Sequence, residues 1–275
     1  MDSIVDFLME PLQYGFMVRA LLVSVLIGII CPVIGSYVVI RSLAFMGDAL
    51  AHAVLPGLVV GMLLGISPFA AGIPMAILIA FLIGYISHRT GVSEDTAIGI
   101  LFAALFALGL VMLKLSGGVG VDLEDILLGQ VLGVSAKDVF VTFGLTLAVL
   151  SVLYLFHKEL VFTSFDPQGA SVIGLPTGMF NYLFLVLLAI AIVVSLKAVG
   201  IVLVMAMLVT PAATSYLLVR GFALMMFVGA ALGVLAAVVG LYVSFYLNIP
   251  SGPAMTLAAV TMFVMAMLAK RKIAF

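Results

Sequence analysis

Charged side chains are scarce in this sequence. Aspartate, glutamate, lysine and arginine make up 8% of the 275 residues, hydrophobic residues make up 66%, and there is no tryptophan. A water-soluble domain carries more charge on its surface, so this composition is typical of a helical protein that crosses a membrane several times. The formal net charge of −1 also argues against a nucleic-acid partner, because such a partner requires a basic surface.

The sequence also lacks the motifs of several enzyme classes. Its single cysteine, Cys31, excludes a disulfide framework and a zinc site built on paired cysteines. No Gly-Lys dipeptide occurs, so the chain has no P-loop, and there is no serine nucleophile elbow or paired-histidine zinc motif. We therefore expect no enzyme activity and no permanently bound cofactor. If ATP drives this protein, a separate ATPase subunit must hydrolyse it.

Long hydrophobic runs separated by charged residues or Gly/Pro clusters predict an all-α membrane protein with about eight or nine spans. The predicted spans are 15–40, 46–65, 69–87, 96–114, 138–156, 179–196, 200–219, 222–246 and 254–269. We expect residues 1–275 to form one transmembrane domain. Residues 1–14 are interpreted as a short amphipathic lead-in, and residues 122–136 as a surface turn with a partial helix.

The basic residues indicate how these spans are oriented. A cytoplasmic C-terminus places seven of the eleven basic residues inside: Arg41, Arg89, Lys158, Arg220, Lys270, Arg271 and Lys272. The remaining four lie outside, as does an acidic group: Arg19, Lys114, Lys137 and Lys197, with Asp122, Glu124 and Asp125. This bias follows the positive-inside rule. An odd number of spans then puts the N-terminus outside.

The strongest candidate site is the run Asp48-x-x-x-His52-x-x-x-Pro56 in the second span. An ionised carboxylate in the middle of a membrane helix costs about 2.5–3.5 kcal/mol, so Asp48 needs a partner. His52 projects from the same helical face one turn later. Pro56 has no N–H for the His52 carbonyl, which becomes a third candidate ligand. The pair predicts either a divalent-metal site or a hydrogen bond that only satisfies two buried polar groups.

Small residues predict where helices touch. Gly57, Gly61 and Gly65 recur at every fourth position after the Asp48/His52 pair, and Gly229 and Gly233 repeat the spacing. Such spacing lets a neighbouring backbone approach closely. Glycine is also common in membrane helices, and this simpler explanation applies more to the second pair.

The loop 157–178 is the least membrane-like internal stretch, and we expect it on the cytoplasmic side. Asp166 suits a helix N-cap, Pro167 suits the first helical position, and Gly174 followed by Pro176 ends the turn. This predicts a helix at about 167–173. A helix so short needs a surface to dock on.

Two further stretches contain possible metal ligands. Ser93 is a good N-cap for the fourth span, and Glu94 and Asp95 complement the helix dipole there, although they could also bind cations at the cytoplasmic end. In the run 209–215, Pro211 predicts a broken helix in which Thr210 lines the pathway. The threonine hydroxyls could equally satisfy carbonyls that the proline leaves free.

These residues together resemble the permease subunits of bacterial ABC importers for manganese, zinc and iron. The likeness covers essentially the whole chain in order. Its segments are Tyr37–Arg41, the run 47–57 with Asp48 and His52, 94–100, 127–132, 165–167 and 200–214. Ala51 replaces the more usual serine before the histidine, and Gln130 replaces a commoner asparagine or aspartate.

The resemblance implies a type II importer in the bacterial plasma membrane. Such a permease pairs with a second copy of itself, with two cytoplasmic ATP-binding subunits and with an extracytoplasmic metal-binding protein. It also implies that Asp48 and His52 line the metal site. The loop helix becomes the coupling helix that contacts the ATPase, and its assigned residues are Asp166, Pro167, Ala170, Ile173 and Gly174.

Oxygen and nitrogen ligands favour Mn²⁺ as the transported ion, with Zn²⁺ or Fe²⁺ as the alternatives. Two other functions stay open. In a proton-coupled secondary transporter, Asp48 would carry protons and the loop helix would be incidental. A membrane scaffold without transport would have no use for an intramembrane Asp–His pair.

Overall fold

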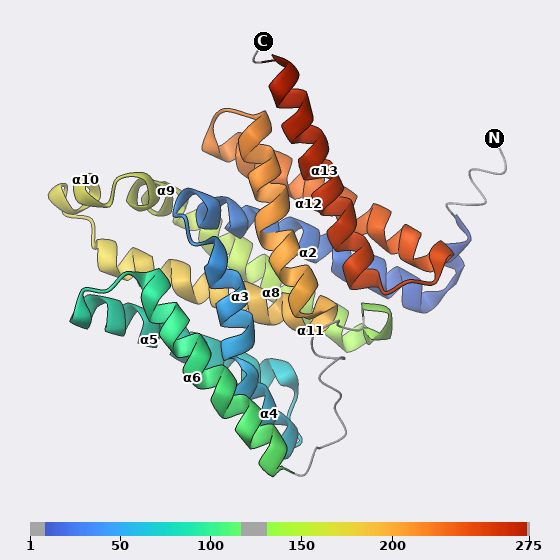
Figure 1. Ribbon diagram of the computed structural model, residues 1–275, viewed down its shortest axis with the longest axis horizontal. Helices are drawn as coiled ribbons and strands as arrows, with labels where there is room; N and C mark the ends of the chain where they lie inside the picture. Colours follow the sequence, from blue (N-terminus) through green and yellow to red (C-terminus); the bar gives the residue numbers. More distant parts are fainter. Residues whose placement is uncertain (1–8, 117–130, 274–275) are drawn as a thin grey trace. The chain divides into compact units, whose positions relative to one another are not determined.

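The fold is described from a computed structural model, which covers residues 9–116 and 131–273, apart from the side chains of residues 68, 69, 197, 198 and 271–273 (Figure 1). These residues form helices and no strand: η1 (Pro11–Gln13), α2 (Gly15–Ile40), α3 (Ala44–Ala53), α4 (Leu55–Leu63), α5 (Pro68–Thr90), α6 (Glu94–Leu115), η2 (Val131–Gly133), α8 (Ala136–Leu155), α9 (His157–Phe165), α10 (Pro167–Val172), α11 (Thr177–Leu218), α12 (Phe222–Leu247) and α13 (Ser251–Ile273). The first eight residues of the predicted lead-in, the acidic group at 122–125 and Gln130 lie outside the described residues.

The predicted spans are confirmed within a few residues. Within the described residues, nine helical stretches are long and apolar enough to cross a membrane: Gly15–Ile40, Ala44–Leu63, Ala70–Thr90, Glu94–Leu115, Ala136–Leu155, Thr177–Leu196, Val199–Leu218, Phe222–Leu247 and Ser251–Lys270. The second stretch combines α3 and α4, and α11 contains the sixth and seventh. The all-α membrane fold predicted from the sequence is therefore observed.

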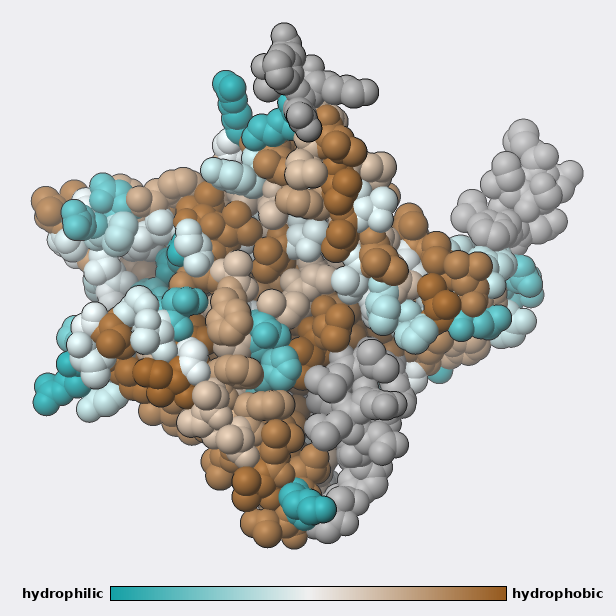
Figure 2. All heavy atoms as spheres, viewed as in Figure 1, coloured by the Kyte–Doolittle hydropathy of each residue, from teal (hydrophilic) through white to brown (hydrophobic). Residues whose placement is uncertain are grey.

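Large hydrophobic side chains cover the outside of these helices. Leu115 of α6 is 81% exposed, and Phe140 of α8 is 76% exposed. Figure 2 shows the surface over α4 and α6 as mostly brown and tan, with teal at the lower end of α6, whereas the surface over α10 mixes teal, white and brown. Water would penalise so much exposed apolar area. This surface therefore fits a hydrocarbon environment, and α10 fits an aqueous one.

The helices are interrupted at two places, one next to a proline and one at a glycine. The break between α3 and α4 falls at Val54, two residues before Pro56, as expected from the missing proline N–H. The predicted break at Pro211 is wrong, because α11 continues through it and departs from helical geometry at Gly200 instead, where φ is 78°. The Thr214 hydroxyl donates to the Thr210 carbonyl at 2.7 Å. This bond does not reach the Met207 carbonyl, which is the one that Pro211 leaves without an N–H partner.

By its contacts the chain divides into two compact units, each described by itself. One comprises residues 1–36, 124–146 and 198–275, and the other comprises 37–123 and 147–197. In the first unit, a Cβ at Gly233 would lie 2.3 Å from the Gly28 carbonyl oxygen, so α2 and α12 meet backbone to backbone. The spacing of Gly229 and Gly233 thus reflects packing rather than composition alone.

The second unit uses two of its three regularly spaced glycines in the same way. A Cβ at Gly57 would lie 2.5 Å from the Met75 Cβ, and a Cβ at Gly61 would lie 2.5 Å from the Ala71 Cβ, so α4 packs tightly against α5. Gly65 differs, because its φ of 65° ends α4 in a left-handed turn and no described atom lies within 4 Å of a Cβ there.

We predict that Gly35→Ala lowers the thermal stability of the protein in detergent. The added Cβ would lie 1.7 Å from the Leu208 carbonyl oxygen. Since a backbone atom cannot rotate away, α2 and α11 must separate, at a cost of about 1–3 kcal/mol or more. The measurement is the unfolding midpoint of the purified protein.

Gly99→Ala is the matched control, because no described atom lies within 4 Å of its added Cβ in α6. Its midpoint should be unchanged or higher, since alanine favours a helix over glycine by about 0.8–1.0 kcal/mol. Equal midpoints for Gly35→Ala and the wild-type protein would show that α2 and α11 do not pack this closely.

Candidate metal site and docking helix

The α3 helix brings Asp48 and His52 together, as their spacing predicts. His52 Nδ1 lies 2.9 Å from the Asp48 backbone carbonyl oxygen and 3.3 Å from Asp48 Oδ1. The side chain of His52 is 17% exposed and that of Asp48 is 32% exposed. The two groups therefore share one partly enclosed position on the helix surface.

The distance between the two side chains suits ligands of one ion. Two atoms that each lie about 2.1 Å from a metal, at about a right angle to one another, are about 3 Å apart. A neutral imidazole with its proton on Nε2 could thus share an ion with Asp48 Oδ1. With the proton on Nδ1, the ring donates to the Asp48 carbonyl and Nε2 becomes the ligand.

Aromatic rings from α6 enclose His52, a feature that the sequence analysis missed. The ring centroids of Phe102 and Phe106 lie 5.6 and 5.3 Å from the His52 centroid, and both rings meet the imidazole edge to face. Phe45 packs against Phe102 in turn. These contacts limit the orientations of the imidazole and keep water from its faces. The four-residue spacing of Phe102 and Phe106 was the available signal.

The site offers few protein ligands. Within residues 9–116 and 131–273, no group of three or more His, Cys, Asp or Glu side chains could hold a metal ion. An ion at Asp48 and His52 would complete its coordination with carbonyls, water or groups from a partner. Such incomplete coordination suits transport, since a passing ion must also be released.

The other predicted metal ligands lie in different surroundings. Glu94 is half-buried at the start of α6 and accepts a hydrogen bond from Asn181 Nδ2, whereas Asp95 is exposed. The Ser93 cap is confirmed, since its Oγ accepts from the Thr96 N–H at 3.2 Å. Thr210 is half-buried in the first compact unit. Metal ligation by these three residues stays a prediction.

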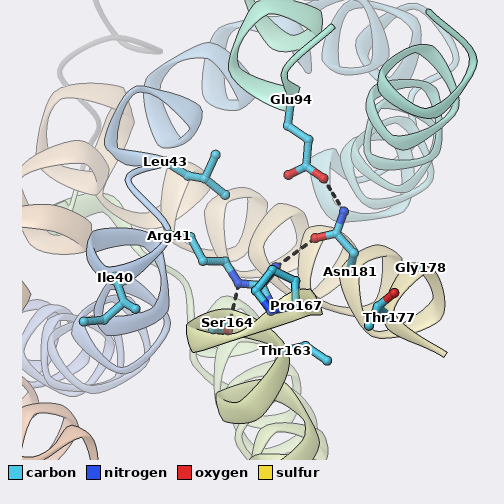
Figure 3. A pocket seen from close by; sticks show the side chains of 10 residues that line it. All are labelled: Ile40, Arg41, Leu43, Glu94, Thr163, Ser164, Pro167, Thr177, Gly178 and Asn181. Atoms are coloured by element: carbon cyan, nitrogen blue, oxygen red, sulfur yellow. Dashed lines mark hydrogen bonds between the residues drawn. The ribbon is translucent and has the colours of Figure 1, made fainter. Parts of the chain in front are cut away.

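A polar network lies beside a pocket of about 500 Å³ in the second unit, between the ends of several helices. Figure 3 shows Arg41 reaching between Ser164 and Asn181, with Glu94 beyond Asn181. Arg41 Nε donates to Ser164 Oγ at 2.8 Å, and Nη1 donates to Asn181 Oδ1 at 2.8 Å. The Asn181 amide then donates to Glu94. We call these four residues the Arg41 network.

Arg41 is a half-buried cation that depends on this network. Its Cζ lies 4.3 Å from the centroid of the Phe184 ring, and its Nη2 is buried with no hydrogen-bond partner among the described residues. Burial lowers the pKa of the guanidinium, and the Glu94 carboxylate acts in the opposite direction. Since an arginine stays protonated in proteins, the ring face and Glu94 supply the compensation that burial requires.

The loop 157–178 contains two helices rather than one. The sequence analysis missed α9, His157–Phe165, because its polar composition resembles a loop. The predicted helix exists as α10, Pro167–Val172, and the Asp166 Oδ1 accepts from the Gly169 N–H at 2.8 Å. Gly174 has a φ of 83° and ends the turn.

The α10 helix is anchored on one side and exposed on the other. Ala170 is fully buried, whereas Val172 is 85% exposed and Ile173 is 67% exposed. A short helix gains stability from such an anchor. The exposed branched side chains leave an apolar face without a partner among the described residues.

Nearly the whole chain is similar to known transport proteins. Residues 13–270 match the ABC 3 transport family. The manganese transport system membrane protein MntC of Halalkalibacterium halodurans is 44% identical over 266 residues, which cover 97% of this chain and 91% of that protein. The chelated iron transport system membrane protein YfeD of Yersinia pestis is 36% identical over 270 residues, covering 98% of this chain and 90% of that protein.

A solved structure agrees with this assignment. A chain in the structure of PsaBC from Streptococcus pneumoniae in complex with Fab matches with a TM-score of 0.85 at 35% identity, covering 96% of this chain and 95% of that one. Sequence and fold therefore agree over nearly the full length. The resemblance noted from the sequence is confirmed, and the chain belongs to the ABC 3 transport family as a membrane-spanning permease.

Proposed function

We propose that this chain is the permease subunit of an ATP-driven importer of divalent transition-metal ions, with Mn²⁺ as its cargo. The Asp48–His52 pair carries the proposal. It places a carboxylate oxygen and an imidazole nitrogen 3.3 Å apart on a membrane helix, where an ionisable pair without a function would only destabilise the protein.

The ligand chemistry favours manganese. A single imidazole beside carboxylate, carbonyl and water oxygens suits Mn²⁺ better than the nitrogen- and sulfur-rich sites that select Zn²⁺. The 44% identity to a protein of a manganese transport system supports the same ion. Zn²⁺ and Fe²⁺ are the alternatives, and the iron transport relative at 36% identity makes Fe²⁺ the nearer one.

The absence of a P-loop and the exposed surface of α10 indicate which partners the permease needs. It has no P-loop, so cytoplasmic ATP-binding subunits must supply hydrolysis, and the exposed end of α10 is their docking site. A second copy of this permease would supply further ligands to the ion, and an extracytoplasmic metal-binding protein would deliver it. The protein lies in the bacterial plasma membrane with its C-terminus in the cytoplasm.

In this mechanism a cation released outside enters between two copies and loses part of its water to Asp48 and His52. The carboxylate balances charge, and both side chains must be deprotonated to bind. Closure of the ATPase pair moves α10, which opens the inner side. Because the chain supplies few ligands, the ion can leave again.

Reconstitution tests this function directly. The permease is incorporated into liposomes with and without its ATPase, and uptake of radioactive manganese is followed after ATP addition. The proposal predicts uptake only with both subunits and ATP. Uptake by the permease alone, driven by a proton gradient, would identify a secondary transporter instead.

We predict that Asp48→Asn and His52→Ala each abolish manganese uptake while the complex still assembles. His52→Ala removes the imidazole ligand, and Asp48→Asn replaces a charged carboxylate ligand with a neutral amide oxygen. The loss of affinity should therefore exceed the about 10–100-fold that removal of an outer-shell partner costs. Calorimetric manganese binding and uptake assays measure the effect. His88→Ala, at the exposed end of α5, is the control and should match the wild type. Normal uptake by Asp48→Asn would contradict the proposed role of the Asp48 negative charge, and normal uptake by His52→Ala would exclude the imidazole as a ligand.

We predict that Ile173→Asp uncouples ATP hydrolysis from transport. This side chain is 67% exposed at the end of α10, so a charge there leaves the permease folded but disfavours an apolar docking surface. Manganese binding by the permease alone should be unchanged, and uptake per ATP hydrolysed should fall. Ser171→Ala, an exposed change on the same helix, should have no effect. If Ile173→Asp transported normally, α10 would not be the docking helix.

A further inference from the structure

The α6 helix connects two parts of the second unit that the proposed function treats separately. Its first residue, Glu94, belongs to the Arg41 network, and Phe102 and Phe106 further along it pack on His52. We infer that Arg41, Asn181 and Glu94 are positioning residues, which hold α6 so that a displacement of α9 and α10 changes how Phe102 and Phe106 enclose His52. This inference rests on the proposed function, and it identifies the residues that couple the ATPase docking helix, α10, to the metal site at His52.

The first step is the connection from the docking helix to α6. Ser164 lies in α9, two residues before Asp166, the N-cap of α10. It accepts from Arg41 Nε, and the same guanidinium donates to Asn181, at the start of α11. Asn181 donates to Glu94. An unbroken chain of side-chain hydrogen bonds therefore runs from the base of α10 to the first residue of α6 (Figure 3).

The second step is the stiffness of this chain. Arg41 is held by two hydrogen bonds and by the Phe184 ring, and its Nη2 is buried. If α9 moved without α6, the guanidinium would lose a partner inside the protein. Leaving a buried charge without its partner is strongly unfavourable. The helix ends therefore move together.

The third step is transmission along α6. Glu94, Ile98, Phe102 and Phe106 recur at four-residue spacing and so lie along one face of the helix. Ile98 is 2% exposed, and the helix contains no proline that would kink it. Eight residues separate Glu94 from Phe102, a distance of about 12 Å along the axis. A tilt of the first turn thus reaches the rings on His52.

A hydrogen-bond exchange between positions 181 and 94 tests this inference. Asn181→Asp still accepts from Arg41 but cannot donate to Glu94, so the connection to α6 is lost. Glu94→Gln still accepts from the asparagine. In the double variant N181D/E94Q, the new amide at position 94 donates to the new carboxylate at position 181, which restores the connection with its direction reversed.

Two readouts are measured for each variant. The first is manganese uptake per ATP hydrolysed by the reconstituted complex. The second is the fluorescence of Phe102→Trp in the permease alone, which has no other tryptophan and so reports the ring beside His52. Arg89→Ala, an exposed arginine at the end of α5, is the control for a lost basic residue. Thermal unfolding checks that each variant is folded, and Glu94→Ala, which keeps the bond between Arg41 and Asn181, replaces Asn181→Asp if that variant does not fold.

We expect Asn181→Asp to lower uptake per ATP by about fivefold or more, the lower end of measured coupling between sites, and to shift the tryptophan emission. Arg89→Ala should match the wild type, and N181D/E94Q should recover both readouts. Glu94→Gln keeps the hydrogen bond but loses the carboxylate charge beside Arg41, so it should retain more of both readouts than Asn181→Asp. Wild-type behaviour of Asn181→Asp in both assays would overturn the inference. So would a double variant no better than Asn181→Asp, because the restored hydrogen bond would then fail to restore the coupling; Glu94→Gln, which keeps the bond and removes the charge, tests the contribution of charge. If the wild-type complex took up no manganese, the proposed function would fail. The tryptophan emission would still test whether the Arg41 network positions the ring beside His52.

Discussion

A carboxylate inside a lipid bilayer must be balanced within the protein, and Asp48 is where this constraint acts most strongly on the chain. Its neighbours on α3 are apolar or small, and His52 is the group that reaches it, at 3.3 Å. An imidazole in hydrogen-bonding distance reduces the cost of burial without removing the negative charge. In the proposed function, a passing cation neutralises that charge and takes the imidazole nitrogen as a second ligand.

The surrounding helices leave the Asp48 and His52 side chains partly buried and partly exposed. Gly57 and Gly61 bring α4 and α5 close together just beyond the site, and α6 packs on α3 with two phenylalanine rings against His52. Apolar rings supply no further ligand. They hold the imidazole and exclude water while leaving the ion weakly coordinated by the protein. A transport site requires this combination, because a fully coordinated ion would not be released.

Arg41 is subject to the same constraint with opposite charge. Its guanidinium is buried beside α9 and α11, and its compensation comes from Ser164, Asn181, Phe184 and the Glu94 carboxylate. Since the residues that stabilise this cation belong to three different helices, α6, α9 and α11, the electrostatic requirement also fixes these helices relative to one another. In the proposed function, the Asp48 charge binds the cargo, and the Arg41 charge holds together the helix ends beside α10, the proposed docking helix.

The features predicted correctly from the sequence are those that short-range rules control. Hydrophobic length located the spans, the four-residue spacing paired Asp48 with His52, and the Asp166 cap with Gly174 defined α10. Contacts across long sequence separations were not predictable from one sequence, and Phe102 on His52 and Arg41 on Asn181 are of this kind. The interpretation of Pro211 as a helix break failed because membrane helices can continue through a proline, as α11 does here. The α9 helix was missed because its polar side chains resemble a loop.

The central claim is that Asp48 and His52 hold the transported ion. Pulsed electron paramagnetic resonance of the permease in lipid nanodiscs loaded with Mn²⁺ tests it most directly, because a directly coordinated imidazole nitrogen modulates the electron spin echo. The wild-type protein should show this nitrogen modulation, and His52→Gln should lose it. A wild-type signal without nitrogen modulation, or one that His52→Gln leaves unchanged, would contradict the assignment.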